Sequence, residues 1–334
     1  MSKISIALCT YNGAKFLPAQ LESFLSQTRL PDELIVCDDG SSDETMEILR
    51  EFAATAPFLV QIFENEKNLR STKNFEKAIA LCTGEIIFLS DQDDVWLPKK
   101  IEKIAAVFDK NKNTGIVFSD AEIVDKNLQP TGRNLWSFTF PEAKRVAAKK
   151  GSFFNVLLSQ NVVTGATMAF RAEYREKFTP IPDNIPNLIH DNWISLVIAA
   201  DAEVDFLEQP LIKYRQHSSQ QLGINFSDLE NQTFNERKRI YAISIEFLKK
   251  EIGRLEKLSE IFTDDPRFAK KLETIDFVDL IEEKQSLMRH LEARKNLPSA
   301  RIARIVPVFR EILSGRYQRL SKGFFSAGKD LLEK

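Results

Sequence analysis

The stretch that decides the fold is Ile86–Trp96, which reads IIFLSDQDDVW. It joins a short apolar run to a turn that holds Asp91, Asp93 and Asp94. A short apolar run bounded by a turn is typical of a buried strand. Three carboxylates within four residues repel one another, and a protein tolerates this most easily where a cation binds. The stretch therefore predicts a strand followed by a site for Mg²⁺ or Mn²⁺, although a solvated acidic turn would show the same residues.

The chain on both sides of this stretch alternates apolar runs with amphipathic segments. Such alternation predicts an α/β fold with a mostly parallel sheet and helices on both faces. Ser41 or Ser42 is the expected cap of the second helix. The predicted strands are 4–9, 33–37, 60–64, 85–89 and 115–119, and the predicted helices are 17–27, 42–55, 71–81 and 99–111. The middle of the chain is less regular, with shorter strands expected at 167–171, 204–206 and 211–214 and a helix at 193–200.

Two further polar clusters follow the first and second predicted strands. They are Thr10–Gly13 (TYNG) and Asp38–Asp43 (DDGSSD). One such cluster is ordinarily a turn with a helix cap, but three at one sheet edge indicate a ligand site, because ligands bind beyond the carboxyl ends of parallel strands. No glycine-rich phosphate loop is present. A nucleotide would therefore be held by carboxylates and a cation, which favours a nucleotide-diphosphate donor.

These motifs, in this order, resemble glycosyltransferase family 2 over about residues 1–225. The resemblance implies a GT-A fold, inversion at the anomeric carbon and a nucleotide-diphosphate sugar donor. It places Tyr11 against the base and Asp39 on the base or ribose. It assigns Asp91, Asp93 and Asp94 to the metal motif of the family, with Asp93 or Asp94 as the direct ligand of the cation. The full set of expected donor contacts is Thr10, Tyr11, Asn12, Asp39, Asp91, Asp93, Arg215 and His217.

The segment Ile189–Trp193 (IHDNW) opens the predicted helix at 193–200. The resemblance places the general base at Asp191, since an inverting transfer needs one carboxylate to accept the acceptor proton. From the residues alone, Asp191 could equally cap the helix. His190 stands where many relatives have Glu, and it could orient Asp191, contact the donor or be structural. The expected acceptor side comprises Thr164, Gly165, His190 and Trp193.

The segment Tyr214–Gly223 (YRQHSSQQLG) offers Arg215 and His217 to the donor diphosphate or the cation, as part of a closing lid. The alternative is that this segment only connects a helix to a strand and that Arg215 has no role in binding. Together with the motifs above, it is similar to bacterial rhamnosyltransferases of polysaccharide assembly, which implies dTDP-L-rhamnose as donor and a saccharide or lipid-linked saccharide as acceptor. Transferases that use a UDP-sugar (GlcNAc, Gal or Glc) share much of the pattern.

Two other classes fit the motifs less well. A sugar nucleotidyltransferase should carry a glycine-rich loop after the first strand, and a non-catalytic sugar-binding relative should lack the acidic residues. Two departures from the family pattern are informative. Arg70 stands where relatives often have Gly. The Gln-x-x-Arg-Trp motif of processive synthases is absent, which predicts one or a few transfers rather than polymer extrusion.

The rest of the chain predicts two appendages. After a catalytic domain over 1–226, residues 227–298 show a helical apolar pattern, predicting two antiparallel helices that pack on their own domain or form a homodimer. Residues 299–334 predict a basic amphipathic tail of two short helices divided at Pro307 and Gly315. This tail either lies on an anionic membrane surface or packs on the domain.

The charge balance is 46 Lys and Arg against 48 Asp and Glu in 334 residues, for a net charge of −2. This excludes a generic nucleic-acid binder. The balance hides an asymmetry, because residues 294–334 hold ten basic and three acidic residues. No run of about 18 apolar residues occurs, and the N-terminal run is too short for a signal peptide. Three cysteines in apolar runs fit reduced core residues. We therefore expect a cytoplasmic protein, at most bound to the inner face of the plasma membrane.

Overall fold

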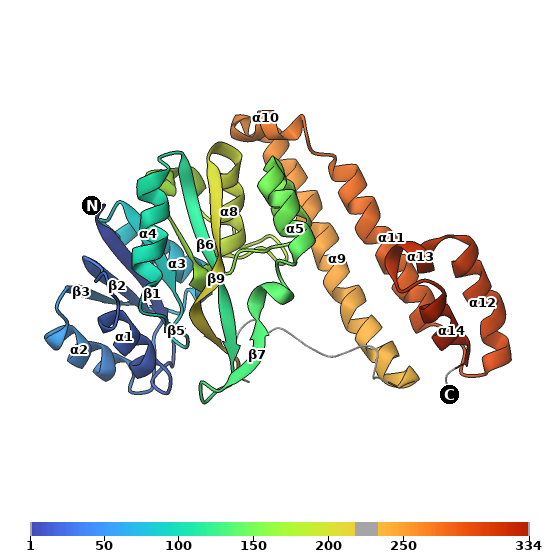
Figure 1. Cartoon of the computed structure of the whole chain (residues 1–334), viewed down its shortest axis with the longest axis horizontal. Coiled ribbons are helices and arrows are strands. Elements are labelled where there is room, and N and C mark those ends of the chain that lie inside the picture. The colour runs from blue at the N-terminus through green and yellow to red at the C-terminus, as the bar shows by residue number, and fades with distance from the viewer. Residues whose placement is uncertain (1, 218–232, 333–334) are drawn as a thin grey trace. The chain divides into compact units, whose positions relative to one another are not determined.

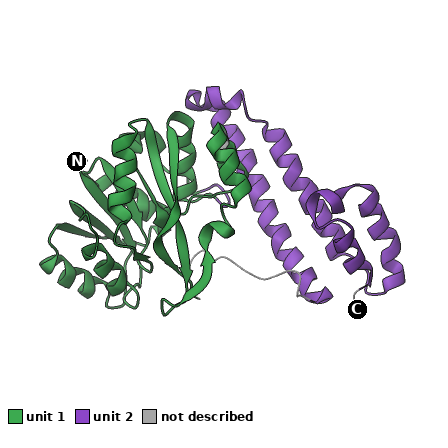
Figure 2. Ribbon diagram, in the orientation of Figure 1, with its two compact units in different colours: residues 1–183, 188–223 green, residues 184–187, 224–334 purple. Residues whose placement is uncertain are grey.

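The computed structural model describes residues 2–217 and 233–332. The chain divides into two compact units (Figure 2). The sheet unit comprises residues 1–183 and 188–223, and the helical unit comprises residues 184–187 and 224–334. The predicted boundary between 226 and 227 lies outside the described residues, as do the tail end at 333–334 and residues 218–223 of the predicted lid.

The sheet unit is built on a mixed sheet in the order β3-β2-β1-β4-β8-β6-β9-β5, with β7 paired to β6 (Figure 1). Its strands are β1 (Ile4–Thr10), β2 (Glu33–Asp38), β3 (Leu59–Glu64), β4 (Ile86–Ser90), β5 (Val95–Trp96), β6 (Thr114–Val124), β7 (Pro130–Asn134), β8 (Met168–Arg171) and β9 (Glu203–Arg215). The first four strands pair in parallel, as the alternation predicts. The central residues of β1, β2 and β4 are fully buried apolar side chains, which explains their short unbroken apolar runs, whereas the edge strand β3 is partly exposed.

The second half of the sheet departs from the parallel pattern. β8 pairs antiparallel with both β4 and β6, and β9 pairs parallel with β6. The two short strands expected at 204–206 and 211–214 are one strand, β9, whose register shifts where Asp120 pairs with Pro210. β6 also runs beyond the predicted 115–119, because the carboxylate of Asp120 accepts hydrogen bonds from the Trp136 amide and the Asn134 side chain, which makes its burial tolerable.

Helices on the sheet bury the apolar faces that the sequence predicts. α3 buries Phe75, Ala78 and Ile79. α8 is buried on almost every side, and this explains its weak amphipathic pattern. The helices of this unit are α1 (Leu17–Leu25), α2 (Thr45–Thr55), α3 (Arg70–Leu81), α4 (Lys100–Lys110), α5 (Glu142–Ala147), α6 (Phe153–Ser159), α7 (Arg175–Phe178) and α8 (His190–Asp201).

The expected cap of the second helix is wrong. α2 begins at Thr45 and its N-cap, Glu44, makes no side-chain cap bond. Ser41 instead donates its hydroxyl hydrogen to Asp38, and Asp43 accepts from the Thr45 amide. The serines are therefore used in the turn after β2, where local hydrogen bonds from short polar side chains compete with capping.

The helical unit contains two long helices, α9 (Phe234–Asp264) and α11 (Phe277–Lys295), with the short α10 (Ala269–Leu272) between them. Thr233 and Glu236 form a reciprocal capping box at the start of α9. Figure 1 shows the two long helices running antiparallel, as the periodicity predicts. Their facing side chains include Ile245, Leu255 and Leu258, which are buried.

The chain ends in α12 (Arg301–Leu313), α13 (Arg316–Leu320) and α14 (Phe324–Leu332). The expected break at Pro307 is wrong, because this residue lies inside α12. The buried side chains of Arg304 and Val308 on either side anchor the helix and outweigh the lost hydrogen bond. Gly315 does separate two helices, with the left-handed φ of 72° that glycine accepts without strain. No helix within the described residues is long and apolar enough to cross a membrane.

Candidate active site

Hydrogen bonds join the three polar clusters at the carboxyl ends of β1, β2 and β4. The Thr10 hydroxyl donates to Asp38 Oδ2 at 2.7 Å. The Asn12 amide donates to Ser41 Oγ at 2.8 Å, and Asn12 Oδ1 accepts from the Ser42 amide at 2.8 Å. The parallel register that aligns these strand ends therefore brings together residues that are about 30 and 80 positions apart in the sequence.

Gln92 ties the acidic turn to the loop after β1. Its Oε1 accepts from the Tyr11 amide at 2.8 Å, and its Nε2 donates to the Tyr11 carbonyl at 3.0 Å. A Cβ at Gly13 would lie 2.1 Å from Gln92 Oε1, so a larger residue there would displace the Gln92 amide. This two-point contact, which we call the Gln92 lock, fixes the backbone of Tyr11 while its ring remains half exposed.

Asp39 is buried, and its carboxylate is already held by the protein. Oδ1 accepts from the Leu69 amide at 2.7 Å and from Asn65 Nδ2 at 2.8 Å, and Oδ2 accepts from the Arg70 amide at 2.9 Å. Arg70 has a φ of 63°, a left-handed conformation that glycine adopts without strain. Asp39 thus fixes the loop before α3 in addition to any role toward a donor.

The turn after β4 concentrates negative charge. Asp94 is buried and accepts from the Arg215 amide at 2.9 Å through Oδ1, while its Oδ2 has no hydrogen-bond partner among the described residues. Burial, reinforced by Asp93 and Asp91, raises the pKa of Asp94 well above its usual range. Burial, together with the negative charges of Asp93 and Asp191, raises the pKa of Asp91 to about 7. A cation bound at this turn would relieve the repulsion between these carboxylates.

The end of β9 closes over this turn. His217 Nε2 lies 2.8 Å from Asp93 Oδ2, and its ring packs on Phe16 at 4.5 Å between centroids. Arg215 is buried and donates from Nε to the Asp93 carbonyl at 2.6 Å and from Nη1 to the Lys126 carbonyl at 2.8 Å. These contacts make Arg215 a clamp on the acidic turn, whereas the sequence predicts a direct donor contact.

The acidic turn fits a hard cation in its chemistry. Asp93 and Asp94 supply carboxylate oxygens, and the Asp94 oxygen without a partner is a buried acceptor that needs a positive charge or a donor. His217 adds a ring nitrogen at Asp93. In residues 2–217 and 233–332 no three His, Cys, Asp or Glu side chains form a complete metal cage. Such a site suits an ion that takes its other ligands from a substrate.

Asp191 lies in the first turn of α8 and is only 5% exposed. Its Oδ2 accepts from the Gly165 amide and its Oδ1 from Asn161 Nδ2, both at 2.9 Å. Burial raises the pKa of Asp191 to about 6, partly offset by these hydrogen bonds. Asp191 also raises the pKa of Asp91, so the two carboxylates are electrostatic neighbours. A carboxylate held at this pKa is suited to accept a proton near neutral pH.

Two of the four residues expected on the acceptor side, Gly165 and His190, contact each other beside Asp191. Gly165 contacts both Asp191 and His190, because a Cβ there would lie 3.0 Å from His190 Nε2. His190 stacks on Phe75 at 4.1 Å, and neither ring nitrogen has a hydrogen-bond partner among the described residues. Burial lowers its pKa to about 3, so the ring is neutral. Trp193 is buried and donates its indole N–H to the Phe178 carbonyl, whereas Thr164 is half-buried beside Gly165.

Sequence reasoning missed two residues of this site. Asn161 is a polar residue in a loop, and only the fold brings it to Asp191. Lys100 is fully buried, donates from Nζ to the Ala166 carbonyl at 2.5 Å and lies 3.6 Å from the centre of the Trp96 ring. Burial lowers the pKa of Lys100, while Asp94 and Asp91 oppose that shift. A lysine at the start of a helix gives no signal that it will be buried below an acidic turn.

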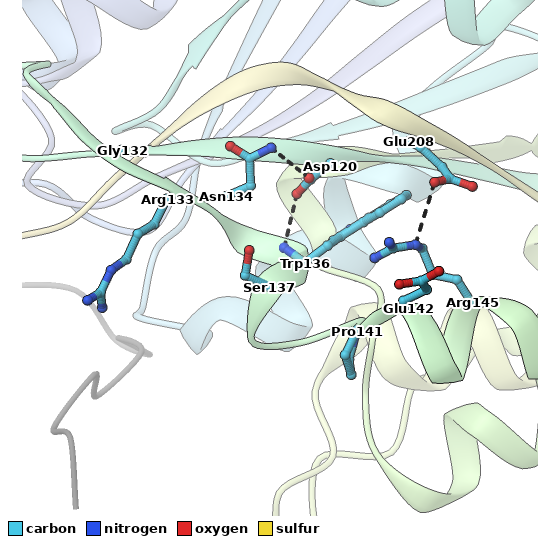
Figure 3. Close-up of a pocket in the computed structure, with 10 residues that line it drawn as sticks. All are labelled: Asp120, Gly132, Arg133, Asn134, Trp136, Ser137, Pro141, Glu142, Arg145 and Glu208. Atoms are coloured by element: carbon cyan, nitrogen blue, oxygen red, sulfur yellow. Dashed lines mark hydrogen bonds and ion pairs between the residues drawn. The ribbon is translucent and has the colours of Figure 1, made fainter. Parts of the chain in front are cut away.

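A separate hollow of about 610 Å³ lies between β7 and α5 (Figure 3). None of its lining residues is a predicted site residue. Several of the polar groups there already have partners within the protein. Asp120 binds Asn134 and the Trp136 amide, and Glu208 pairs with Arg145. We therefore place the candidate site at the carboxyl ends of β1, β2 and β4.

The fold is shared with known sugar transferases of GT-A type. One similar structure is S. aureus TarS in complex with UDP-GlcNAc, with a TM-score of 0.56 and 17% identity over 96% of this chain and 92% of that one. Another is the mannosyltransferase PcManGT of Pyrobaculum calidifontis in complex with GDP-Man and Mn²⁺, with a TM-score of 0.57 and 16% identity over 99% and 87% of the two chains. At these identities the likeness shows the fold.

The sequence shows the family. An uncharacterized glycosyltransferase of a Nostoc species is 27% identical over 65% of this chain and 66% of its own length. The dTDP-rhamnosyl transferase RfbG of Shigella flexneri is 26% identical over 66% and 75% of the two chains. The profile of glycosyl transferase family 2 matches residues 5–179, more than half of the chain. The protein belongs to glycosyl transferase family 2 and is a glycosyltransferase.

Arg70 offers a first test of the site. We expect Arg70→Gly to retain or slightly raise the melting temperature, because glycine relieves the left-handed strain of roughly 1 kcal/mol. The same change should raise the donor KM roughly tenfold, because it removes an exposed cation beside the loop that Asp39 holds. Arg70→Lys, which keeps the charge, is the control and should leave KM close to wild type. An unchanged donor KM in Arg70→Gly would limit Arg70 to a role in the loop conformation.

Proposed function

We propose that the protein is an inverting glycosyltransferase that transfers L-rhamnose from dTDP-L-rhamnose to a saccharide or lipid-linked saccharide acceptor in bacterial surface polysaccharide synthesis. The observation that carries the chemistry is Asp191, buried, fixed by two hydrogen bonds and electrostatically coupled to the acidic turn. The likeness to RfbG over two thirds of this chain supports the rhamnosyl donor. The reaction takes place in the cytoplasm or at the inner face of the plasma membrane.

Asp191 is the general base of this reaction. It accepts the proton of the acceptor hydroxyl while that oxygen attacks the anomeric carbon and the nucleotide diphosphate leaves from the opposite side, so the configuration inverts. Gly165 and Asn161 orient the carboxylate. The neutral ring of His190 packs against Gly165 and positions the base without adding charge.

The donor is held at the carboxyl ends of β1, β2 and β4. Tyr11 stacks on the base, and Thr10, Asn12 and Asp39 shape the nucleoside subsite. Asp93 and Asp94, with His217, hold Mg²⁺ or Mn²⁺ at the diphosphate, and Asp91 faces the sugar. When bound, the cation neutralises charge that develops on the leaving diphosphate. Arg215 keeps the acidic turn in place through the Asp93 carbonyl.

A UDP-sugar is the second candidate donor. The structure of TarS with UDP-GlcNAc aligns with 96% of this chain, including the part after the family match. In both candidates the same residues hold the diphosphate, and the difference lies in the base and the sugar. A sugar nucleotidyltransferase is less well supported, because residues 10–13 form a loop locked by Gln92 and no glycine-rich phosphate loop follows β1.

A donor panel tests the proposal. Purified protein is incubated with dTDP-L-rhamnose, UDP-GlcNAc, UDP-Gal and UDP-Glc, each with Mn²⁺, with Mg²⁺ or with EDTA, and release of nucleoside diphosphate is measured. We expect dTDP release with either cation and at least a tenfold loss in EDTA. Turnover of a UDP-sugar without turnover of dTDP-L-rhamnose would replace the donor and keep the mechanism. Full activity in EDTA would contradict the role given to the acidic turn.

A further inference from the structure

α12 exposes most of its apolar side chains, while its charged residues Arg304 and Glu311 are buried. Ile302 and Leu313 are 84% and 85% exposed, and Ile305, Val306 and Phe309 are also exposed. These five residues follow the spacing i, i+3, i+4, i+7 and i+11, so they form one stripe along the helix. Globular helices turn such a stripe toward the core. The described part of the chain places nothing on it.

The opposite face of α12 explains this orientation. Arg304 is almost fully buried, donates to the carbonyls of Pro298, Ser299 and Asp330, and lies 3.8 Å from the centre of the Phe234 ring. Glu311 on the same face pairs with Arg316 and His290. Val308 joins the small apolar core of the unit. The hydrogen bonds of Arg304 and the ion pairs of Glu311 fix the rotation of the helix about its axis. The apolar stripe on the opposite face is therefore exposed.

The charges that remain exposed in this region have one sign. Between 299 and 332 the sequence holds two acidic residues, Glu311 and Asp330. Both are buried, and Asp330 pairs with Arg294 and accepts from the Tyr317 hydroxyl. The exposed charged residues of the same range are basic: Arg301, Arg310, Arg319 and Lys322. The surface of this region therefore combines an apolar stripe with positive charge.

We propose that α12, assisted by the start of α14, binds the surface of an anionic lipid bilayer. An apolar stripe with flanking cations is the pattern of helices that lie in the membrane interface. α12 has 13 residues, too few for the roughly 20 that span a bilayer, so it lies on the surface. Phe324 and Phe325 of α14 are about two-thirds exposed and add apolar side chains on a helix packed against α12.

A lipid surface fits this region better than a second copy of the chain. An isologous contact would bring two copies of the same positive surface together, which costs free energy, whereas anionic headgroups attract each cation and strengthen binding roughly fivefold per charge. An apolar patch of this kind on a monomer ordinarily marks an interaction surface.

Cosedimentation of the full-length protein with vesicles tests the proposal. Vesicles of phosphatidylcholine mixed with phosphatidylglycerol are compared with vesicles of phosphatidylcholine alone. We expect wild type to bind the anionic vesicles at least tenfold more tightly. Ile302→Gln/Phe309→Gln/Leu313→Gln should weaken this binding at least tenfold, and Arg301→Gln/Arg310→Gln/Lys322→Gln roughly a hundredfold.

The matched control is Ile243→Gln/Phe247→Gln/Val278→Gln. It removes three other exposed apolar side chains from α9 and α11 of the same unit, and it should bind as wild type does. Thermal melts confirm that each variant is folded. Equal binding by wild type and by the α12 variant would overturn the proposal. So would a lipid-free dimer, seen by sedimentation velocity, that the α12 substitutions convert to a monomer.

Discussion

Asp191→Asn is expected to lower kcat roughly a thousandfold with little change in donor KM. The amide keeps the shape of the carboxylate but cannot accept the acceptor proton, and a positioned general base contributes about 10²–10⁴ in rate. The substitution removes a desolvated charge but also replaces one of the two acceptor oxygens with an NH₂ group, so the melting temperature should change little. Steady-state kinetics and a thermal melt on the same preparation give both quantities.

The same residue sets a pH dependence. Burial raises the pKa of Asp191 to about 6, and only the deprotonated form is a base. Activity should therefore fall as the pH drops below about 6 and level off above it. Asn161→Ala removes a hydrogen bond to the charged form, which should raise this pKa by up to about one unit and move the limb to higher pH. A wild-type rate in Asp191→Asn would contradict the assignment of Asp191 as the general base. So would an acidic limb of the pH–rate profile that does not move in Asn161→Ala.

Asp93→Asn is expected to lower activity at least a hundredfold and to weaken Mn²⁺ binding in the presence of nucleoside diphosphate. It replaces a charged oxygen ligand with a neutral amide, and cation stabilisation of a leaving diphosphate is worth several kcal/mol. The amide can still form a hydrogen bond to His217, so the end of β9 should stay in place. Activity measured across a Mn²⁺ titration separates lost affinity from lost turnover.

Asp43→Asn is the matched control for Asp93. Asp43 lies at the same edge of the sheet, but its carboxylate accepts from the Ala14 and Thr45 amides within the loops. Its removal should lower stability by about 1 kcal/mol and leave the Mn²⁺ dependence unchanged. Equal Mn²⁺ dependence in wild type and in Asp93→Asn would show that the cation, if used, is held elsewhere.

The sequence predicts the parallel half of the fold because each β-strand there is a short apolar run followed by its own turn. The same regularity places Tyr11, Asp39 and Asp91 at one edge. The strand β8 is predicted, but its antiparallel direction is not, because the direction depends on pairing with β4 and β6 rather than on its four residues. β9 reads as two strands because a register shift interrupts its pattern.

The electrostatics of the site depend on residues with no local signal. Lys100 looks like an exposed lysine at a helix start, yet the helix buries it below the acidic turn. Asn161 reaches Asp191 only through the loop before β8. In α12, periodicity predicts which residues share a face, but the ion pair of Glu311 with Arg316 and the hydrogen bonds of Arg304 to backbone carbonyls decide which face turns inward. A sequence pattern does not show which charged residues, far apart in the chain, will pair with one another in the fold.

The Gln92 lock has a consequence for donor selection. Through it, the loop of Tyr11 and the turn of Asp91, Asp93 and Asp94 form one rigid piece. With the base on Tyr11 and the diphosphate at the turn, as proposed, this piece holds the two binding positions of a nucleoside diphosphate at a fixed distance. It therefore selects for the length of the nucleotide and does not select for the sugar attached to it. Discrimination between donor sugars therefore depends on residues beyond the Gln92 lock, beginning with Asp91, which is proposed to face the sugar.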